Sequence, residues 1–166
     1  MSYFVRKIAP SKWENNNAIS DVRNYNADCF SDINTTKNQL SVWKVSEISD
    51  SSILEVASVL ASEFKTKVGF ISLVCFEENK AIDTFVSIVK DDKTKCALID
   101  KKTEHYEIDK MNYNKLGLFA KCVYEEKIQK RVFKVIWDDI VQNIKTLIAE
   151  NKIDITKLGE ALKKSL

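Results

Sequence analysis

Several short stretches of the chain have apolar patterns that predict β-strands. Leu40–Val45 (LSVWKV) places apolar residues on both sides of a period-2 pattern, and Val68–Phe76 (VGFISLVCF) is apolar almost throughout. Strands of this kind are covered on both faces. We expect two further strands, at Tyr3–Ile8, which ends before Pro10, and at His105–Ile108, on an edge of the sheet.

Other stretches follow the helical period. Apolar residues in Asp50–Phe64 recur at spacings of three and four, which predicts an amphipathic helix. Either Asp50 or Ser52 suits its N-cap, and Ser52 with Glu55 fits a capping box. Three more helices are predicted towards the C-terminus, at Tyr113–Lys127, Val132–Glu150 and Ile155–Lys164.

Two interpretations stay open for the region between residues 78 and 100. Thr84–Lys90 and Lys95–Asp100 predict a hairpin, with Asp91 and Asp92 in its turn. Glu78–Val89 also fits a helix.

A long polar segment, Asn15–Asn38, has no clear period. It is longer than most connections inside a compact domain, which favours a functional, mobile or partly helical segment. Ala27–Ile33 suits a short helix within it, and Asp28 and Asp32 are its candidate binding residues. We expect this segment to be a contact loop.

Together these elements predict an α+β fold. We expect a small mixed sheet of about four to five strands, packed by one amphipathic helix and followed by a C-terminal three-helix segment. Residues 1–109 would form the mixed α+β region, and residues 110–166 the helical region, packed on it as one compact unit. A length of 166 residues suits a single domain with a substantial core.

Charge is distributed unevenly around a net value of +2. Residues 1–109 contain 14 Lys and Arg against 17 Asp and Glu, whereas residues 110–166 contain 12 against 7. Four basic residues of the second region would share one face of a continuous helix, although we expect the chain to turn between Lys127 and Val132; they are Lys127, Lys130, Arg131 and Lys134. Such a face predicts contact with phosphates, so a nucleic-acid-binding module is one expected function.

Cysteine and histidine usage argues against a metal or disulfide framework. Cys29, Cys75, Cys96 and Cys122 are far apart and are expected to be reduced and buried. His105 is the single histidine and has no ligand partner at the usual zinc spacing, so no cofactor is predicted.

The N-terminus lacks an apolar signal segment, and no apolar run is long enough to span a membrane. We therefore expect a soluble cytoplasmic protein without a membrane partner. Abundant Lys, Ile and Asn suggest an AT-rich bacterial or phage genome.

One acidic pattern resembles the PD-(D/E)xK nuclease family. Asp100-Lys101-Lys102 matches D-x-K directly after the apolar stretch CALI. The expected order of helix, three strands and helix between Asp50 and Lys127 also resembles that family's core. The family's upstream proline is missing, because Pro10 is the only proline.

This resemblance implies a Mg²⁺-dependent nuclease in which Asp100 holds the metal and Lys102 steadies the nucleophile. Further carboxylates would come from an upstream position and from the preceding helix, and the candidates are Asp83, Asp91, Asp92, Glu55 and Glu63.

Other catalytic signatures are missing. Gly69, Gly117 and Gly159 are isolated, so the chain contains no P-loop or dinucleotide fingerprint. The leading expectation is a non-catalytic interaction protein that acts as partner, inhibitor or regulatory subunit of another protein, in a bacterial or phage defence or toxin–antitoxin setting. Trp13 is expected to anchor such an interface.

Overall fold

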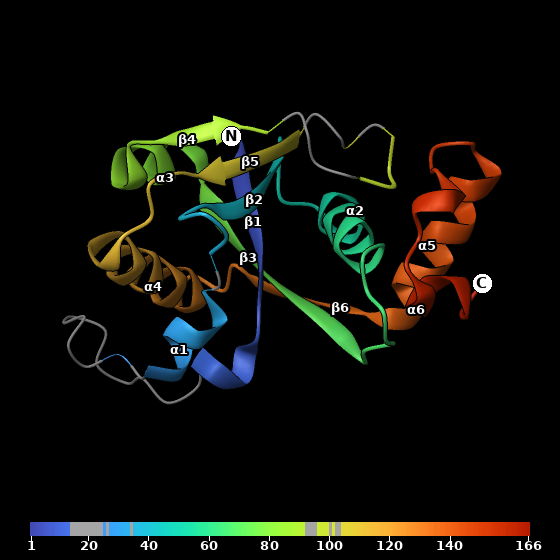
Figure 1. Ribbon diagram of the computed structural model, residues 1–166, viewed down its shortest axis with the longest axis horizontal. Coiled ribbons are helices and arrows are strands. Elements are labelled where there is room, and N and C mark those ends of the chain that lie inside the picture. Colours follow the sequence, from blue (N-terminus) through green and yellow to red (C-terminus); the bar gives the residue numbers. More distant parts are fainter. Residues whose placement is uncertain (14–24, 26, 34, 92–95, 100, 102–103) are drawn as a thin grey trace.

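A six-stranded open sheet lies at the centre of the described part of the computed structural model (Figure 1). The structure describes residues 1–13, 25, 27–33, 35–91, 96–99, 101 and 104–166. The strand order is β4-β5-β2-β1-β3-β6, and all neighbours are antiparallel. The strands are β1 (Tyr3–Ile8), β2 (Leu40–Val45), β3 (Phe70–Glu77), β4 (Ile88–Lys90), β5 (His105–Ile108) and β6 (Val132–Ile136).

Helices cover both faces of this sheet, with α1, α3 and α4 on one face and α2, α5 and α6 on the other (Figure 1). They span α1 (Ala27–Asp32), α2 (Asp50–Ala61), α3 (Glu78–Phe85), α4 (Tyr113–Ile128), α5 (Trp137–Ala149) and α6 (Glu160–Lys163). The predicted α+β class is confirmed. The sheet has more strands than the four to five expected, and two helical layers replace the one amphipathic helix.

Side-chain alternation along the strands explains the two layers. In β1, Val5 points into the core beneath α2 and α5, whereas Phe4 and Ile8 point into the core beneath α1, α3 and α4. In β3, Leu73 and Val74 divide in the same way. Because successive strand residues face opposite sides of the sheet, a strand that is apolar throughout is buried only if helices pack on both faces.

The predicted strands at Tyr3–Ile8, Leu40–Val45 and His105–Ile108 have the expected bounds. The expected edge position of His105–Ile108 is wrong, because this strand, β5, lies between β2 and β4. The short strand β4 pairs its Ile88 with Ile108 of β5 and so takes the edge.

The region around residues 78–100 combines the two interpretations. A helix, α3, is followed two residues later by a strand, β4, which pairs with β5 and not with the described residues 96–99. Asp92, Lys95 and Asp100 lie outside the described residues. Within the described stretch 96–99, Leu98 forms an isolated bridge with Ile153 instead of a strand.

The capping box of α2 forms one turn earlier than predicted. Ser49 is the N-cap; its hydroxyl accepts a hydrogen bond from Ser52 N at 3.2 Å, and its own N–H donates to Ser52 Oγ at 3.1 Å. Two otherwise unpaired backbone donors are satisfied in this way. Glu55 pairs with Lys101 at 2.9 Å instead, and α2 ends at Ala61, before Phe64.

The predicted helix Val132–Glu150 is wrong in its first turn and a half. Val132–Ile136 is the strand β6, which pairs with Phe70–Val74 of β3, and α5 begins immediately after it. Valine, isoleucine and phenylalanine favour a pleated, half-buried surface, and the available edge of β3 provides one.

The predicted helix Ile155–Lys164 is divided into two short pieces. A 3-10 turn spans Ile155–Lys157, and α6 begins at Glu160. The backbone of Gly159 between them is extended, and its N–H donates to Ser62 O at the end of α2, at 2.6 Å.

Val86, which ends α3, has a backbone conformation that valine rarely adopts. Its φ of 63° strains a β-branched residue, while its side chain is 83% exposed. Val86→Gly removes the strain without removing buried apolar surface, so we expect the free energy of unfolding to rise by about 1 kcal/mol. Urea denaturation measures the change.

The matched control is Val89→Gly, which alters an exposed valine in β4 whose φ is negative. At Val89 glycine only increases the conformational entropy of the unfolded chain, so the free energy of unfolding should fall. A fall in both variants would contradict strain at Val86.

Candidate functional site

Trp13, the expected interface anchor, lies in the core with 1% of its surface exposed. Its indole Nε1 donates a hydrogen bond to Asp32 Oδ2 at 2.7 Å, and the same oxygen accepts the N–H of Ala9 at 2.7 Å. Asp32 therefore fixes the end of β1 against α1. Asp28 is exposed in the first turn of α1.

The four basic residues do not share one helical face. Lys127 lies in α4, and its Nζ donates to Trp13 O at 2.6 Å. Lys130 has a φ of 58° in the turn that ends α4, and Lys134 lies in β6, with its Nζ 4.1 Å from the centre of the Phe70 ring. The expected turn between Lys127 and Val132 is present, but the chain beyond it is the strand β6 and not a helix, so the four residues share no helical face.

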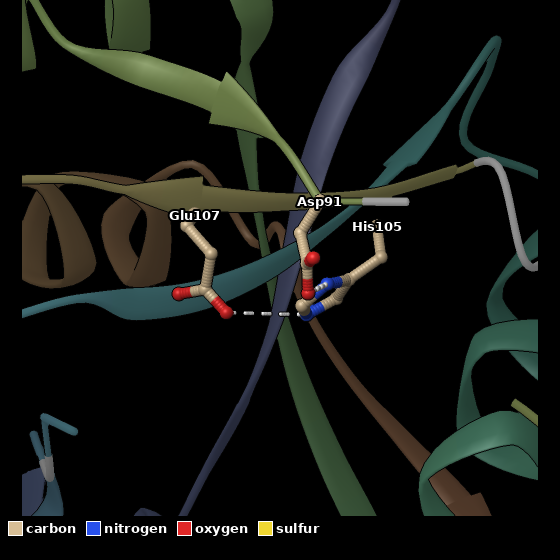
Figure 2. A group of neighbouring side chains, drawn as sticks. All are labelled: Asp91, His105 and Glu107. Atoms are coloured by element: carbon tan, nitrogen blue, oxygen red, sulfur yellow. Dashed lines mark hydrogen bonds and ion pairs between the residues drawn. The ribbon is translucent and has the colours of Figure 1, made fainter. Parts of the chain in front are cut away.

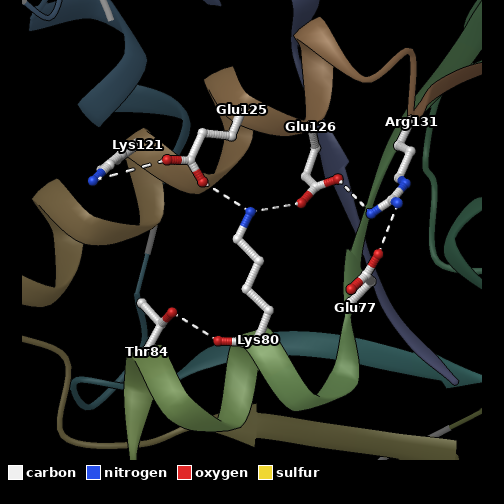
Figure 3. A network of polar contacts seen from close by, with 7 residues as sticks. All are labelled: Glu77, Lys80, Thr84, Lys121, Glu125, Glu126 and Arg131. Atoms are coloured by element: carbon white, nitrogen blue, oxygen red, sulfur yellow. Dashed lines mark hydrogen bonds and ion pairs between the residues drawn. The ribbon is translucent and has the colours of Figure 1, made fainter. Parts of the chain in front are cut away.

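Arg131 joins an ion-pair network around the buried carboxylate of Glu126 (Figure 3). Glu126 of α4 is fully buried and contacts Arg131 Nη1 and Lys80 Nζ, both at 3.1 Å. Arg131 also pairs with Glu77 at 2.7 Å, and Lys80 with Glu125 at 2.8 Å. This network joins α3, α4 and the end of β3.

Of the candidates implied by the nuclease resemblance, only Asp91 belongs to a group of possible metal ligands in the described part of the chain. Asp83 is exposed on α3, Glu55 pairs with Lys101, and Glu63 lies just beyond α2. Asp100 and Lys102 lie outside the described residues. The expected order also differs, because α3 separates β3 from β4, and β1 and β2 separate β3 from β5 in the sheet.

Asp91, His105 and Glu107 form a cluster where β4 ends and β5 begins (Figure 2). His105 Nδ1 lies 3.1 Å from Asp91 Oδ2, and Nε2 lies 3.7 Å from Glu107 Oε1. The imidazole is 4% exposed, whereas the two carboxylates are partly open to solvent. The cluster therefore combines one nitrogen ligand and two oxygen ligands within reach of water.

Neighbouring groups hold this cluster in place. The backbone N–H of Asp91 donates to His105 O at 3.0 Å, which joins the end of β4 to β5. Ser41 Oγ donates to Glu107 Oε1 at 2.9 Å, and the Trp43 ring lies 4.8 Å from the His105 ring between centres. The adjacent strand β2 thus orients both side chains.

The sequence contained one signal for this cluster. His105 and Glu107 are two residues apart in a predicted strand, so they share a face. The usual zinc motifs place two ligands about three to six residues apart, so two ligands separated by a single residue do not match them. Asp91 joins only through the β4–β5 pairing, which the sequence did not predict.

The four cysteines are free and buried, as predicted. Burial raises the pKa of the Cys75 thiol to about 12 and that of Cys122 to about 11. Thiols with such pKa values stay protonated near neutral pH and are poor nucleophiles.

The outer edge of β6 presents backbone groups to solvent. Cys75 N donates to Arg131 O at 3.0 Å and Trp137 N to Gly69 O at 3.1 Å, so the odd-numbered residues bond to β3. Antiparallel pairing alternates, so the backbones of Val132, Lys134 and Ile136 point outward. In the described sheet β6 pairs with β3 alone, so these groups lie on its outer edge.

A groove of about 540 Å³ runs beside this edge, between α2 and α5. Ile53, Phe133 and Val135 provide apolar walls, and the carboxylates of Asp50 and Asp139 lie on its rim. The groove and the β6 edge form one continuous surface, which we call the β6 edge surface.

None of the helices described here has the length and apolar character needed to cross a membrane. Comparisons of the chain with protein-family models, with curated proteins and with solved structures gave no match.

Proposed function

We propose that this chain is an interaction protein that binds an extended segment of another protein along the β6 edge surface. It would act as a partner, inhibitor or regulatory subunit of that protein. The observation that carries the proposal is the row of outward-pointing backbone groups at Val132, Lys134 and Ile136 beside a groove with both apolar and polar walls. Exposed sheet edges of this kind accept an added strand through main-chain hydrogen bonds.

The groove specifies the chemistry of the partner segment. Phe133 and Val135 point towards α2 and α5, so alternate partner side chains would enter the groove and should be apolar. Asp50 and Asp139 would attract a Lys or Arg at one end of the segment. The expected ligand is therefore an extended peptide with alternating apolar residues and one basic residue.

Charge favours a different protein over a second copy of this chain. Lys134 is the only charged residue of β6 and lies at its centre. Two copies paired antiparallel about that centre would place Lys134 opposite its equivalent, and like charges directly opposite are destabilising.

Lys134→Pro tests the proposal, because the N–H of Lys134 points away from β3. Proline therefore removes an outward donor without removing a β3–β6 hydrogen bond, as edge strands tolerate. We expect it to weaken binding about ten-fold or more. The probe is a synthetic peptide of alternating apolar residues and one lysine, selected for affinity to the whole chain, with binding measured by calorimetry.

Lys134→Ala is the matched control, since it removes the same charge and keeps the N–H. Amide hydrogen exchange adds a second readout: bound peptide should protect Val132, Lys134 and Ile136, which exchange fast in the free chain. Equal peptide affinity in the proline and alanine variants, or protection elsewhere, would contradict pairing at β6. Self-association that Lys134→Pro abolishes would assign the edge to a second copy.

A further inference from the structure

The cluster of Asp91, His105 and Glu107 lies at the opposite end of the sheet from β6. We propose that it binds one divalent ion of the zinc class, with one imidazole nitrogen and one oxygen of each carboxylate as ligands. This site does not depend on the proposed function, because it shares no residue with the β6 edge surface.

Distances between the ligand atoms suit a single ion. One candidate ligand atom from each residue lies within 4.8 Å of the other two. Three atoms so spaced are all within about 2.8 Å of a common point, whereas zinc bonds to nitrogen and oxygen are about 2.0–2.2 Å. Carboxylate rotations that shift each oxygen by less than about 1 Å would complete the contacts.

The site is organised before an ion arrives. Packing of the Trp43 ring and burial to 4% exposure limit the rotation of His105. The hydrogen bond from Ser41 Oγ holds Glu107 Oε1, the oxygen that lies 3.7 Å from His105 Nε2, on the side of the imidazole. Hydrogen bonds from outer groups commonly orient metal ligands in this manner.

The donor set indicates which ions would bind. A neutral imidazole nitrogen favours Zn²⁺, Mn²⁺ or Fe²⁺ over Mg²⁺ and Ca²⁺, which prefer oxygen ligands alone. Asp91 and Glu107 are on the partly exposed side, so water would fill the remaining positions. A three-ligand site with open positions is the arrangement that proteins use to activate water.

Calorimetric titration of the whole chain with Zn²⁺ tests this inference. We expect one Zn²⁺ per chain, with Mg²⁺ failing to compete at equal concentration. Co²⁺ should bind in its place and give visible absorption bands of a nitrogen- and oxygen-ligated ion.

Isosteric variants locate the ion. Asp91→Asn and Glu107→Gln keep the shape of the site, and each should weaken Zn²⁺ binding about ten-fold or more, since each removes an anionic ligand. Asp109→Asn is the matched control, because it neutralises a carboxylate one residue beyond β5 that accepts a hydrogen bond from Gln39. It should bind Zn²⁺ like the unaltered chain.

Circular dichroism confirms that each variant is folded before titration. Absence of Zn²⁺ binding to the folded, unaltered chain at 100-fold excess would overturn the inference. Binding that survives unchanged in both Asp91→Asn and Glu107→Gln, or that Asp109→Asn weakens equally, would also overturn it.

Discussion

Replacing Glu126 with alanine should lower the free energy of unfolding by about 3–5 kcal/mol. Glu126 is fully buried and is shared by Lys80 and Arg131. Removing its carboxylate takes one of two counter-charges from each cation, and it also leaves a cavity where the fully buried side chain stood. Urea denaturation at neutral pH measures the loss.

Glu125→Ala is the matched control, because Glu125 is the adjacent residue, carries the same charge and also pairs with Lys80. Its side chain is 31% exposed, so water replaces the lost contact, and a loss of about 0–1 kcal/mol is expected. Similar losses in the two variants would show that the burial of Glu126 does not increase its contribution to the free energy of unfolding.

Gly159→Ala should destabilise the chain by about 1–3 kcal/mol. A Cβ at this position would lie 2.5 Å from Phe64 O and 3.0 Å from Ser62 O, both backbone atoms beyond α2. The close approach lets Gly159 N bond to Ser62 O and Ala161 N to Phe64 O. Alanine would push α6 away from the core, where Leu162 is fully buried.

Gly69→Ala separates this clash from the general effect of the substitution. A Cβ at Gly69 would have no atom within 4 Å, and the φ of Gly69 is not positive. Alanine there should leave stability unchanged or raise it by up to about 1 kcal/mol, because it restricts the unfolded chain. Thermal unfolding of both variants compares them directly, and an equal change would exclude a clash at Gly159.

Local patterns were sufficient to predict α2, β1, β2 and the class of the fold. In each of these elements, the apolar period agrees with the propensity of its residues, so sequence and packing favour the same structure. Strand order was not predictable, because it depends on pairings between distant segments, such as Val5 with Cys75. One example is β5, which the sequence placed at an edge that β4 occupies.

The boundary between β6 and α5 shows how a pattern can mislead. Val132, Ile136, Ile140 and Ile144 are spaced by four, which suits one continuous helical stripe. The first two instead belong to a strand, and only the available edge of β3 distinguishes the two structures. The four basic residues share no helical face for a related reason, because Lys134 belongs to this strand, whereas the turn at Lys130 lies where one was expected.

The candidate sites were less predictable than the fold. Trp13 and Asp32 were selected as contact residues because their surroundings are polar in sequence, yet they bond to each other. His105 was set aside because it has no ligand nearby in the chain, although β4 brings Asp91 to it. Side-chain clusters of this kind depend on which strands become neighbours.

The position of β6 has a consequence for synthesis. Of the six described strands β1 is synthesised before the others, but it lies between β2 and β3 in the sheet, and β3 acquires its outer neighbour only when residues 132–136 have emerged. Until then β3 exposes an apolar edge of its own. A nascent chain at this stage offers the same kind of pairing surface that we propose for β6, and prompt addition of the last strand protects it from aggregation.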